Sequence, residues 1–114
     1  MPDHIANSIG HFDVSGPDAD QLHSFYSGVF GWAITTKGPG YALVETPAGS
    51  PNGAIVEAQN ASLTIGIVVP DIDHAVAEAI AHGGQVAMPV MDNGWVKNAA
   101  LLDPAGNRLT IIQA

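Results

Sequence analysis

The stretch Pro17-Asp18-Ala19-Asp20 returns 53 positions later as Pro70-Asp71-Ile72-Asp73, and this repetition decides the fold. Two further landmarks keep the same spacing. Gly31 matches Gly84, and Ser50-Pro51-Asn52-Gly53 matches Asp103-Pro104-Ala105-Gly106. Because one offset serves all three blocks without a gap, we interpret the chain as an internal duplication.

The duplication divides the chain of 114 residues into two modules of similar length. We place the first module at residues 8–60 and the second at 61–114. A segment of this size cannot bury a sufficient core by itself. We therefore expect the two modules to fold together as a single domain over residues 1–114.

The first module predicts one strand, one helix and three more strands. Ser8–Val14 alternates between apolar and polar residues, as a strand does. Asp18 caps the following helix and Gly31 ends it. The helix has one apolar stripe made of Leu22, Phe25, Tyr26, Val29 and Phe30. The three later strands are expected near Trp32–Thr36, Tyr41–Thr46 and Ala54–Ala58.

The second module predicts the same order of elements. Leu63–Val69 is rich in β-branched residues and predicts a strand. Asp71 or Asp73 caps the next helix, whose stripe is Ile72, Val76, Ala79 and Ile80, and Gly83-Gly84 ends it. Three strands follow near Gln85–Met88, Val96–Leu102 and Arg108–Gln113. The expected fold is α+β, two tandem βαβββ modules with a helix on one face of each sheet and the other faces curved into a cup.

Composition excludes several classes of function. The chain has 11 acidic and 3 basic residues and a formal net charge of −8, which argues against nucleic acid and anionic membranes as partners. Cysteine is absent, so thiol nucleophiles and thiolate metal sites are excluded. We found no apolar run long enough for a membrane span and no signal-peptide pattern, and we expect a cytoplasmic protein. Only 12% of residues are charged, which favours a subunit interface and a homodimer.

Three blocks of sequence carry a resemblance to a known superfamily. They are Gly10-His11-Phe12-Asp13-Val14, the run from Phe25 to Trp32 (FYSGVFGW), and Asp103-Pro104-Ala105-Gly106-Asn107-Arg108. Together with the paired βαβββ order, they resemble the vicinal oxygen chelate superfamily of glyoxalases, bleomycin-resistance proteins and extradiol dioxygenases. The resemblance covers almost the whole chain and implies the cup fold, whereas the function stays open because this scaffold hosts many chemistries.

The resemblance also implies four positions for metal ligands, one on the first and one on the last strand of each module. The first-strand position is His11, and the 53-residue offset pairs it with Thr64. The last-strand position of the second module is Thr110, which the same offset pairs with Glu57. The set thus reads His, Glu, Thr and Thr. Since threonine hydroxyls are poor ligands for transition metals, the set departs from the usual pattern.

Several interpretations of His11 and Glu57 stay open. They could hold a divalent metal ion, with a third oxygen from Asp13 on the same strand face or from Glu45. Alternatively, His11 lines a ligand pocket and hydrogen-bonds to Glu57 or water, or the two residues form a metal-free acid–base couple.

Other residues extend the candidate ligand pocket. They are Trp95, which follows the turn Asp92-Asn93-Gly94, and Asn98, which lies 53 residues from Glu45, with Tyr41 as a further candidate. His74, Glu78 and His82 share one helical face, as a chelating site or as a solvated surface.

Three functions remain in competition. The first is a module that binds a small organic molecule, with a cation as one candidate, without a complete metal site. The second is a divalent-metal enzyme, such as a glyoxalase-like lyase, an isomerase or a dioxygenase, in which the ion stabilises developing enolate charge. The third is a non-catalytic dimeric scaffold. No catalytic residue is assigned.

Overall fold

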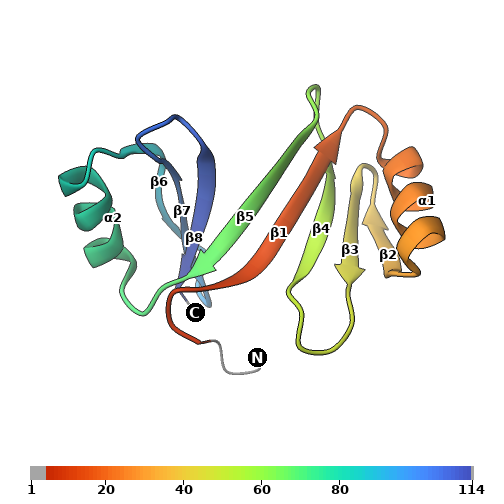
Figure 1. Cartoon of the computed structure of the whole chain (residues 1–114), viewed down its shortest axis with the longest axis horizontal. Helices are drawn as coiled ribbons and strands as arrows, with labels where there is room; N and C mark the ends of the chain where they lie inside the picture. Colours follow the sequence, from red (N-terminus) through yellow and green to blue (C-terminus); the bar gives the residue numbers. More distant parts are fainter. Residues whose placement is uncertain (1–4, 114) are drawn as a thin grey trace. The chain divides into compact units, whose positions relative to one another are not determined.

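The computed structural model describes residues 5–113, and each half of the chain has the βαβββ order that the sequence predicts. The first half contains β1 (Ser8–Gly16), α1 (Ala19–Phe30), β2 (Ala33–Gly38), β3 (Tyr41–Glu45) and β4 (Asn52–Glu57). The second half contains β5 (Ser62–Val68), α2 (Ile72–Ala81), β6 (Gln85–Asp92), β7 (Lys97–Leu102) and β8 (Arg108–Gln113) (Figure 1). The predicted α+β class and the two βαβββ modules are confirmed.

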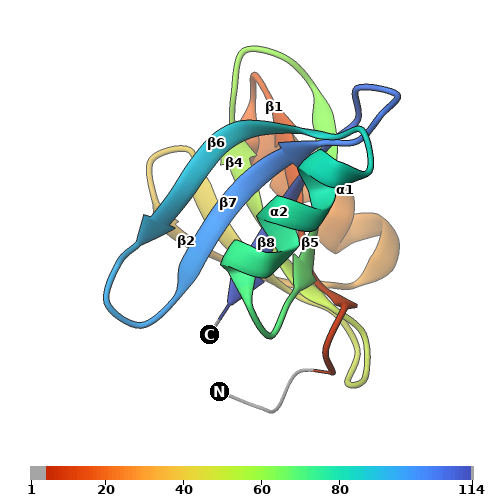
Figure 2. The ribbon, with the colours of Figure 1, turned by 90° about the vertical axis from the view of Figure 1, so that its left-hand side faces the viewer.

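The chain divides into two compact units, and the division falls inside β1 and β5. One unit is His11–Thr64, and the other joins the residues up to Gly10 to those from Ile65 onward. In the first unit the strand order is β2-β3-β4-β1, and in the second it is β5-β8-β7-β6. The β1–β4 and β5–β8 pairs are parallel, and their neighbours are antiparallel. One helix covers one face of each sheet, as Figure 2 shows for α2 over β7 and β8.

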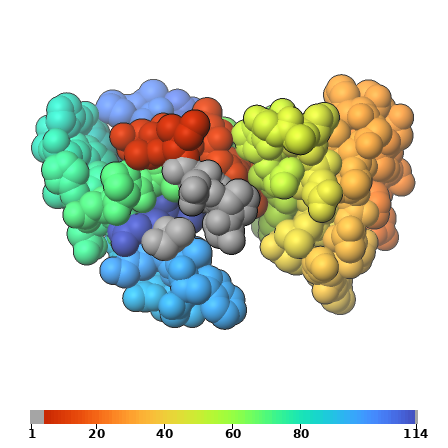
Figure 3. Space-filling model, turned by 90° about the horizontal axis from the view of Figure 1, so that it is seen from below, coloured from red at the N-terminus to blue at the C-terminus, as the bar shows by residue number. Residues whose placement is uncertain are grey.

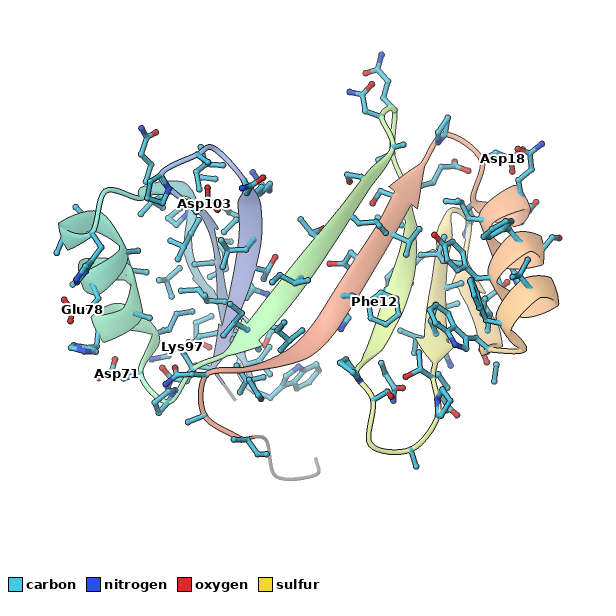
Figure 4. All side chains as sticks on the ribbon, in the orientation of Figure 1. Phe12, Asp18, Asp71, Glu78, Lys97 and Asp103 are labelled. Carbon is cyan, nitrogen blue, oxygen red and sulfur yellow. The ribbon has the colours of Figure 1, made fainter. Side chains whose placement is uncertain are left out.

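Both helices begin at an aspartate. The Asp18 carboxylate accepts a hydrogen bond from the Gln21 N–H at 3.1 Å, and Asp71 accepts one from the His74 N–H at 3.1 Å. Each carboxylate satisfies an N–H that the first helical turn leaves unpaired. The cap of the second helix is therefore Asp71 and not Asp73. Figure 4 labels both capping residues at the starts of their helices.

The core of the first unit lies between its sheet and α1. Val14, Ala42, Val44 and Ile55 are buried there. Leu22, Tyr26 and Trp32 pack against them, and the Tyr26 and Trp32 rings stack with centroids 5.6 Å apart. The predicted stripe on α1 is only partly correct. Its members Phe25, Val29 and Phe30 are 52%, 59% and 56% exposed, because the small sheet reaches only the Leu22 and Tyr26 side of the helix.

The core of the second unit lies beneath α2. Val69, Ile72, Ala99, Leu101 and Ile111 are buried in it, and Val76 and Ala79 pack against them. The predicted stripe on α2 is correct except for Ile80, which is 57% exposed.

The gapless 53-residue offset is wrong for the last two strands of the modules. In the parallel pairs, Val14 lies opposite Ile55 and Ile67 lies opposite Ile111. Val14 and Ile67 are 53 positions apart, whereas Ile55 and Ile111 are 56 apart. The offset is larger still for β3 and β7. Ile55 pairs with Ala42 and Ile111 pairs with Ala99, and Ala99 lies 57 positions after Ala42.

A longer hairpin explains the change of offset. β6 has 8 residues and two register shifts, whereas β2 has 6 residues and one. Because of these extra residues, the offset between equivalent residues of the two modules exceeds 53 in the strands that follow. The matching blocks at 50–53 and 103–106 are therefore not equivalent: Gly53 is a strand residue within β4, while Gly106 sits in a turn with a φ of 96°.

The turn before β8 is organised by Asp103. Its carboxylate accepts hydrogen bonds from the side chain of Asn107 at 3.0 Å and from the backbone N–H groups of Asn107 and Ala105 at 2.9 Å. The Asn107 side chain, followed by these backbone donors, lowers the pKa of the Asp103 carboxyl below its ordinary value of 3.8. The D-P-x-G-N block thus has a structural role.

Neither helix in residues 5–113 is long and apolar enough to cross a membrane.

Candidate functional site

The first unit's sheet has one face covered by α1 and one free of helix. Phe12 and Val14 of β1 point toward the covered face, where they belong to the core. Side chains alternate along a strand, so His11, Asp13 and Ser15 lie on the other face. We call this surface the helix-free face of the first module. His11 and Asp13 are both half-buried there.

Strand register places most of the predicted polar residues on this same face. Asp13 lies beside Ala54, and Ala54 lies beside Leu43. The alternation that buries Ala42 and Val44 places Tyr41, Leu43 and Glu45 on the helix-free face. Asp13, Glu45 and Tyr41 therefore share a face with His11, and all three were candidates from the sequence.

Two residues of this face were missed by the sequence reading. Leu43 is 40% exposed at its centre, and Asn52 lies beside His11 in the parallel register. The signal that could have found them is the period of two along β3 and β4, because every second residue of those strands shares the face of Tyr41.

His11 is paired with Asp13. The His11 Nε2 and Asp13 Oδ1 atoms are 3.0 Å apart, and the two side chains are 34% and 29% exposed. An ionised carboxylate can only accept, so the Nε2 nitrogen carries the proton of this hydrogen bond. In the neutral ring the other nitrogen, Nδ1, is then left to accept a hydrogen bond from a ligand. Asp13 thereby fixes both the tautomer and the orientation of the imidazole.

Glu57 lies on the opposite, helix-covered side. It pairs with Gly16 in the β1–β4 register, two residues after the buried Ile55. Its Oε1 atom accepts a hydrogen bond from the Ala19 N–H at 3.2 Å, at the start of α1. A Cβ added to Gly40 would lie only 2.9 Å from the Glu57 Cβ, so the Glu57 side chain packs closely over that turn. The structure therefore does not bring His11 and Glu57 together.

The second module contains the counterpart of this anchor. The Gln113 Oε1 atom accepts a hydrogen bond from the Ile72 N–H at 2.7 Å, at the start of α2. Glu57 and Gln113 are 56 positions apart, which is the offset measured for β4 and β8. In both modules the end of the last strand thus supplies an acceptor to the first turn of the helix.

The donors at the four expected ligand positions do not fit a divalent metal centre. With the corrected offset of 56, the counterpart of Thr110 is Ala54, which has no donor atom. The set becomes His11, Ala54, Thr64 and Thr110, in which His11 alone is a good ligand for a transition metal. Residues 5–113 hold no group of three or more His, Cys, Asp or Glu side chains placed to bind one ion.

The three candidate metal ligands on α2 do not form a better metal site. His74, Glu78 and His82 are exposed along α2. The Nδ1 atom of His82 lies 2.8 Å from the backbone carbonyl oxygen of Glu78, so this ring nitrogen donates to the end of its own helix.

The remaining candidates lie apart from the His11 pair along the sequence and differ in surroundings. Thr110 pairs with Gly66 and Ala100, and Asn98 pairs with Ile112 and Met91, so both belong to a mainly apolar surface. The counterpart of Asn98 by the 57-residue offset is Tyr41, and the predicted match with Glu45 is wrong. Thr64 is half-buried on β5, and Trp95 is 80% exposed in the β6–β7 turn. It stays a prediction that these four residues line a ligand pocket: Thr64, Trp95, Asn98 and Thr110.

The helix-free face of the first module can therefore make two kinds of contact. Tyr41 and Leu43, which are 43% and 40% exposed, and the half-buried Val56 provide apolar surface, as small-molecule sites usually do. Around them Asp13 and Glu45 offer carboxylate oxygens, and His11 offers an acceptor nitrogen when its ring is neutral. Thr35, Tyr41 and Asn52 on the same face carry groups that can donate as well as accept hydrogen bonds.

Comparison with known proteins identifies the family. The model of the family described as "Glyoxalase-like domain" matches residues 11–112. No match was found among curated protein sequences.

Solved structures share the fold at low sequence identity. A glyoxalase/bleomycin resistance protein/dioxygenase superfamily member from Vibrio splendidus 12B01 is 13% identical, with a TM-score of 0.73 over 96% of this chain and 100% of that one. Methylmalonyl-CoA epimerase from Mycobacterium tuberculosis is 12% identical, with a TM-score of 0.73 over 99% of this chain and 92% of that one. A Mn(II)-bound glyoxalase from Novosphingobium aromaticivorans is 17% identical, with a TM-score of 0.76 over 95% of this chain and 39% of that one. At these identities the likeness concerns the fold.

Proposed function

Since the chain belongs to the glyoxalase-like domain family, we propose that it binds a small organic molecule on the helix-free face of the first module without a complete metal site. The observation that carries the proposal is the strand register. The register makes Ala54, and not Glu57, the counterpart of Thr110 at the fourth expected ligand position. Glu57 instead accepts a hydrogen bond at the start of α1. One imidazole that is already paired with Asp13 is a poor basis for a catalytic metal, which usually has three protein ligands.

Charge points to a cationic ligand. The face carries the carboxylates of Asp13 and Glu45. The other residues that the strand register places on this face are neutral, apart from His11: Ser15, Ala33, Thr35, Tyr41, Leu43, Asn52, Ala54 and Val56. Lys37 of β2 lies at the register break between Thr36 and Gly38 and has no partner in the register. The formal net charge of −8 adds a long-range attraction for cations. We infer an organic cation whose apolar part contacts Leu43 and whose charged group reaches a carboxylate.

A homodimer belongs to the same proposal. The low charged fraction of 12% is joined by large apolar side chains that stay exposed in the single chain, including Phe30 at 56% and Leu63 at 73%. Burying such side chains is a common source of subunit association. Sedimentation equilibrium should give twice the mass of the chain, and a monomer at all concentrations would contradict the dimer.

The test of ligand binding uses matched charge variants. Organic cations and neutral isosteres of the same size are screened by thermal shift, and the best ligand is titrated calorimetrically. One of the two substitutions Asp13→Asn and Glu45→Gln should weaken binding by about tenfold or more, because it removes the charge-assisted hydrogen bond to the ligand. Unchanged affinity in both variants would overturn the role of the carboxylates. Glu78→Gln, which removes the same charge from α2, should leave the affinity unchanged.

Metal titration tests the alternative that the protein binds a divalent metal ion. Purified protein is titrated with Ni(II), Zn(II), Mn(II) and Fe(II), and wild type is compared with His11→Ala. Stoichiometric binding that His11→Ala abolishes would overturn the metal-free proposal and favour a metal-dependent enzyme. Equal affinity for cations and neutral isosteres would overturn the assignment of ligand charge.

A further inference from the structure

The β6–β7 turn contains an Asn-Gly pair, a dipeptide whose side-chain amide can react with the following backbone nitrogen. Asp92 ends β6, and Asn93, Gly94 and Trp95 form the turn. All four residues are exposed, and Figure 3 shows this hairpin (light blue) projecting from the rest of its unit. The sequence has one other such pair, Asn52-Gly53 in β4.

The groups around Asn93 are arranged for that reaction. The Gly94 N–H donates to the Asp92 carboxylate at 2.9 Å, so a base stands at the proton that must leave. The Asn93 Oδ1 atom accepts hydrogen bonds from the N–H groups of Trp95 at 3.3 Å and Val96 at 3.1 Å. These donors lie where negative charge develops when the amide carbon is attacked. A Cβ added to Gly94 would meet no atom within 4 Å, so nothing packs against the Gly94 α-carbon on that side.

We propose that Asn93 is a site of spontaneous deamidation, promoted by the Asp92 carboxylate. The Gly94 nitrogen attacks the Asn93 Cγ atom and its proton passes to Asp92. The Cγ–Nδ2 bond then breaks, the departing nitrogen takes up a proton, and ammonia leaves behind a five-membered succinimide ring. One water molecule opens the ring at either carbonyl and gives an aspartyl or an isoaspartyl residue. Water is consumed and ammonia released, with no change of oxidation state.

The second Asn-Gly pair is held against the same reaction. The Asn52 Oδ1 atom also accepts a hydrogen bond, from the Thr46 N–H at 3.0 Å, so the two sites differ at the glycine and not at the amide oxygen. Gly53 is buried and is paired on both sides, with Phe12 and with Val44. A Cβ added to Gly53 would meet the Phe12 backbone oxygen and lie 2.7 Å from the Phe12 ring, so the surroundings of this glycine are tightly packed. The fold therefore distinguishes two identical dipeptides.

The product changes the hairpin in two ways. Either product adds a negative charge beside Asp92, and the isoaspartyl form also adds one methylene to the backbone of the turn that presents Trp95.

The test follows both sites in the full chain. Folded protein is incubated at physiological temperature and mildly alkaline pH, and peptide mapping records the mass gain of about 1 Da at each asparagine. We expect Asn93 to react at least about tenfold faster than Asn52 in the folded protein, and the two sites to react at similar rates in concentrated urea. Equal rates in the folded protein would overturn the site.

A charge-matched pair of variants tests the base. Asp92→Ser keeps a hydrogen-bond acceptor but removes the carboxylate, and it should slow the reaction of Asn93 by about tenfold or more. Glu78→Gln, a neutralisation elsewhere in the same unit, should leave the rate unchanged. An unchanged rate in Asp92→Ser, with circular dichroism showing a folded chain, would overturn the role of Asp92.

Discussion

Replacing Glu57 by alanine distinguishes an anchor of α1 from a metal ligand. The substitution removes the acceptor that the Ala19 N–H donates to at 3.2 Å, at an exposed helix start. Loss of such a bond costs about 1 kcal/mol of unfolding free energy. The shorter 2.7 Å bond from the Ile72 N–H to Gln113 is partly buried, so Gln113→Ala should cost more, about 1–2 kcal/mol.

Urea unfolding followed by circular dichroism measures both losses. Each kcal/mol corresponds to a fall in Tm of about 4 °C for a chain of this size. Glu57→Gln should keep most of the stability, because glutamine already performs this task at position 113. Glu45→Ala, the same change on the helix-free face, should leave stability nearly unaltered. The reasoning is refuted if Glu57→Ala unfolds at the wild-type urea midpoint but loses stoichiometric metal binding.

Three further substitutions test the fold. Gly53→Ala should cost about 1–3 kcal/mol, measured by urea unfolding, because its methyl group would overlap the backbone oxygen and the ring of Phe12; a wild-type midpoint would contradict the packing. Ile72→Ala should cost about 2–5 kcal/mol in the same assay, since Ile72 is fully buried, and a cost below that range would show that the site collapses. Asp103→Asn should destabilise the chain above the ordinary aspartate pKa of 3.8. Since the folded-state pKa is lowered, the ionised carboxyl stabilises the fold there, and the difference from wild type should vanish as pH falls through the folded value; a pH-independent difference would contradict it.

Local signals predicted the elements well. Asp18 and Asp71 precede apolar residues at helical spacing, and each caps a helix in the structure. The β8 strand has the predicted bounds of Arg108–Gln113. These features depend on residues close together in the chain, such as a cap and the N–H groups of the next turn, so a sequence is sufficient to find them.

The candidate site was predicted only in part. The alternation of β1 correctly placed His11 and Asp13 on one face, because side-chain direction along a strand is a local property. The predicted link between His11 and Glu57 depended on counting 53 residues through the β6–β7 hairpin. That hairpin adds four residues relative to its counterpart, and the β7–β8 connection is one residue shorter than the β3–β4 connection. The net shift of three residues is odd, and an odd shift moves a side chain to the other face of a sheet.

The sequence alone determined the βαβββ order of both modules, the cap of the first helix and the residues available for chemistry. Tertiary structure alone decided which strands pair at which register, and with it that Glu57 anchors a helix, that His11 pairs with Asp13, and that two identical Asn-Gly pairs have different surroundings. The physical reason is that caps and periodicity act over a few residues. Strand register, by contrast, is set by hydrogen bonds between distant segments and by the lengths of the hairpins that join them.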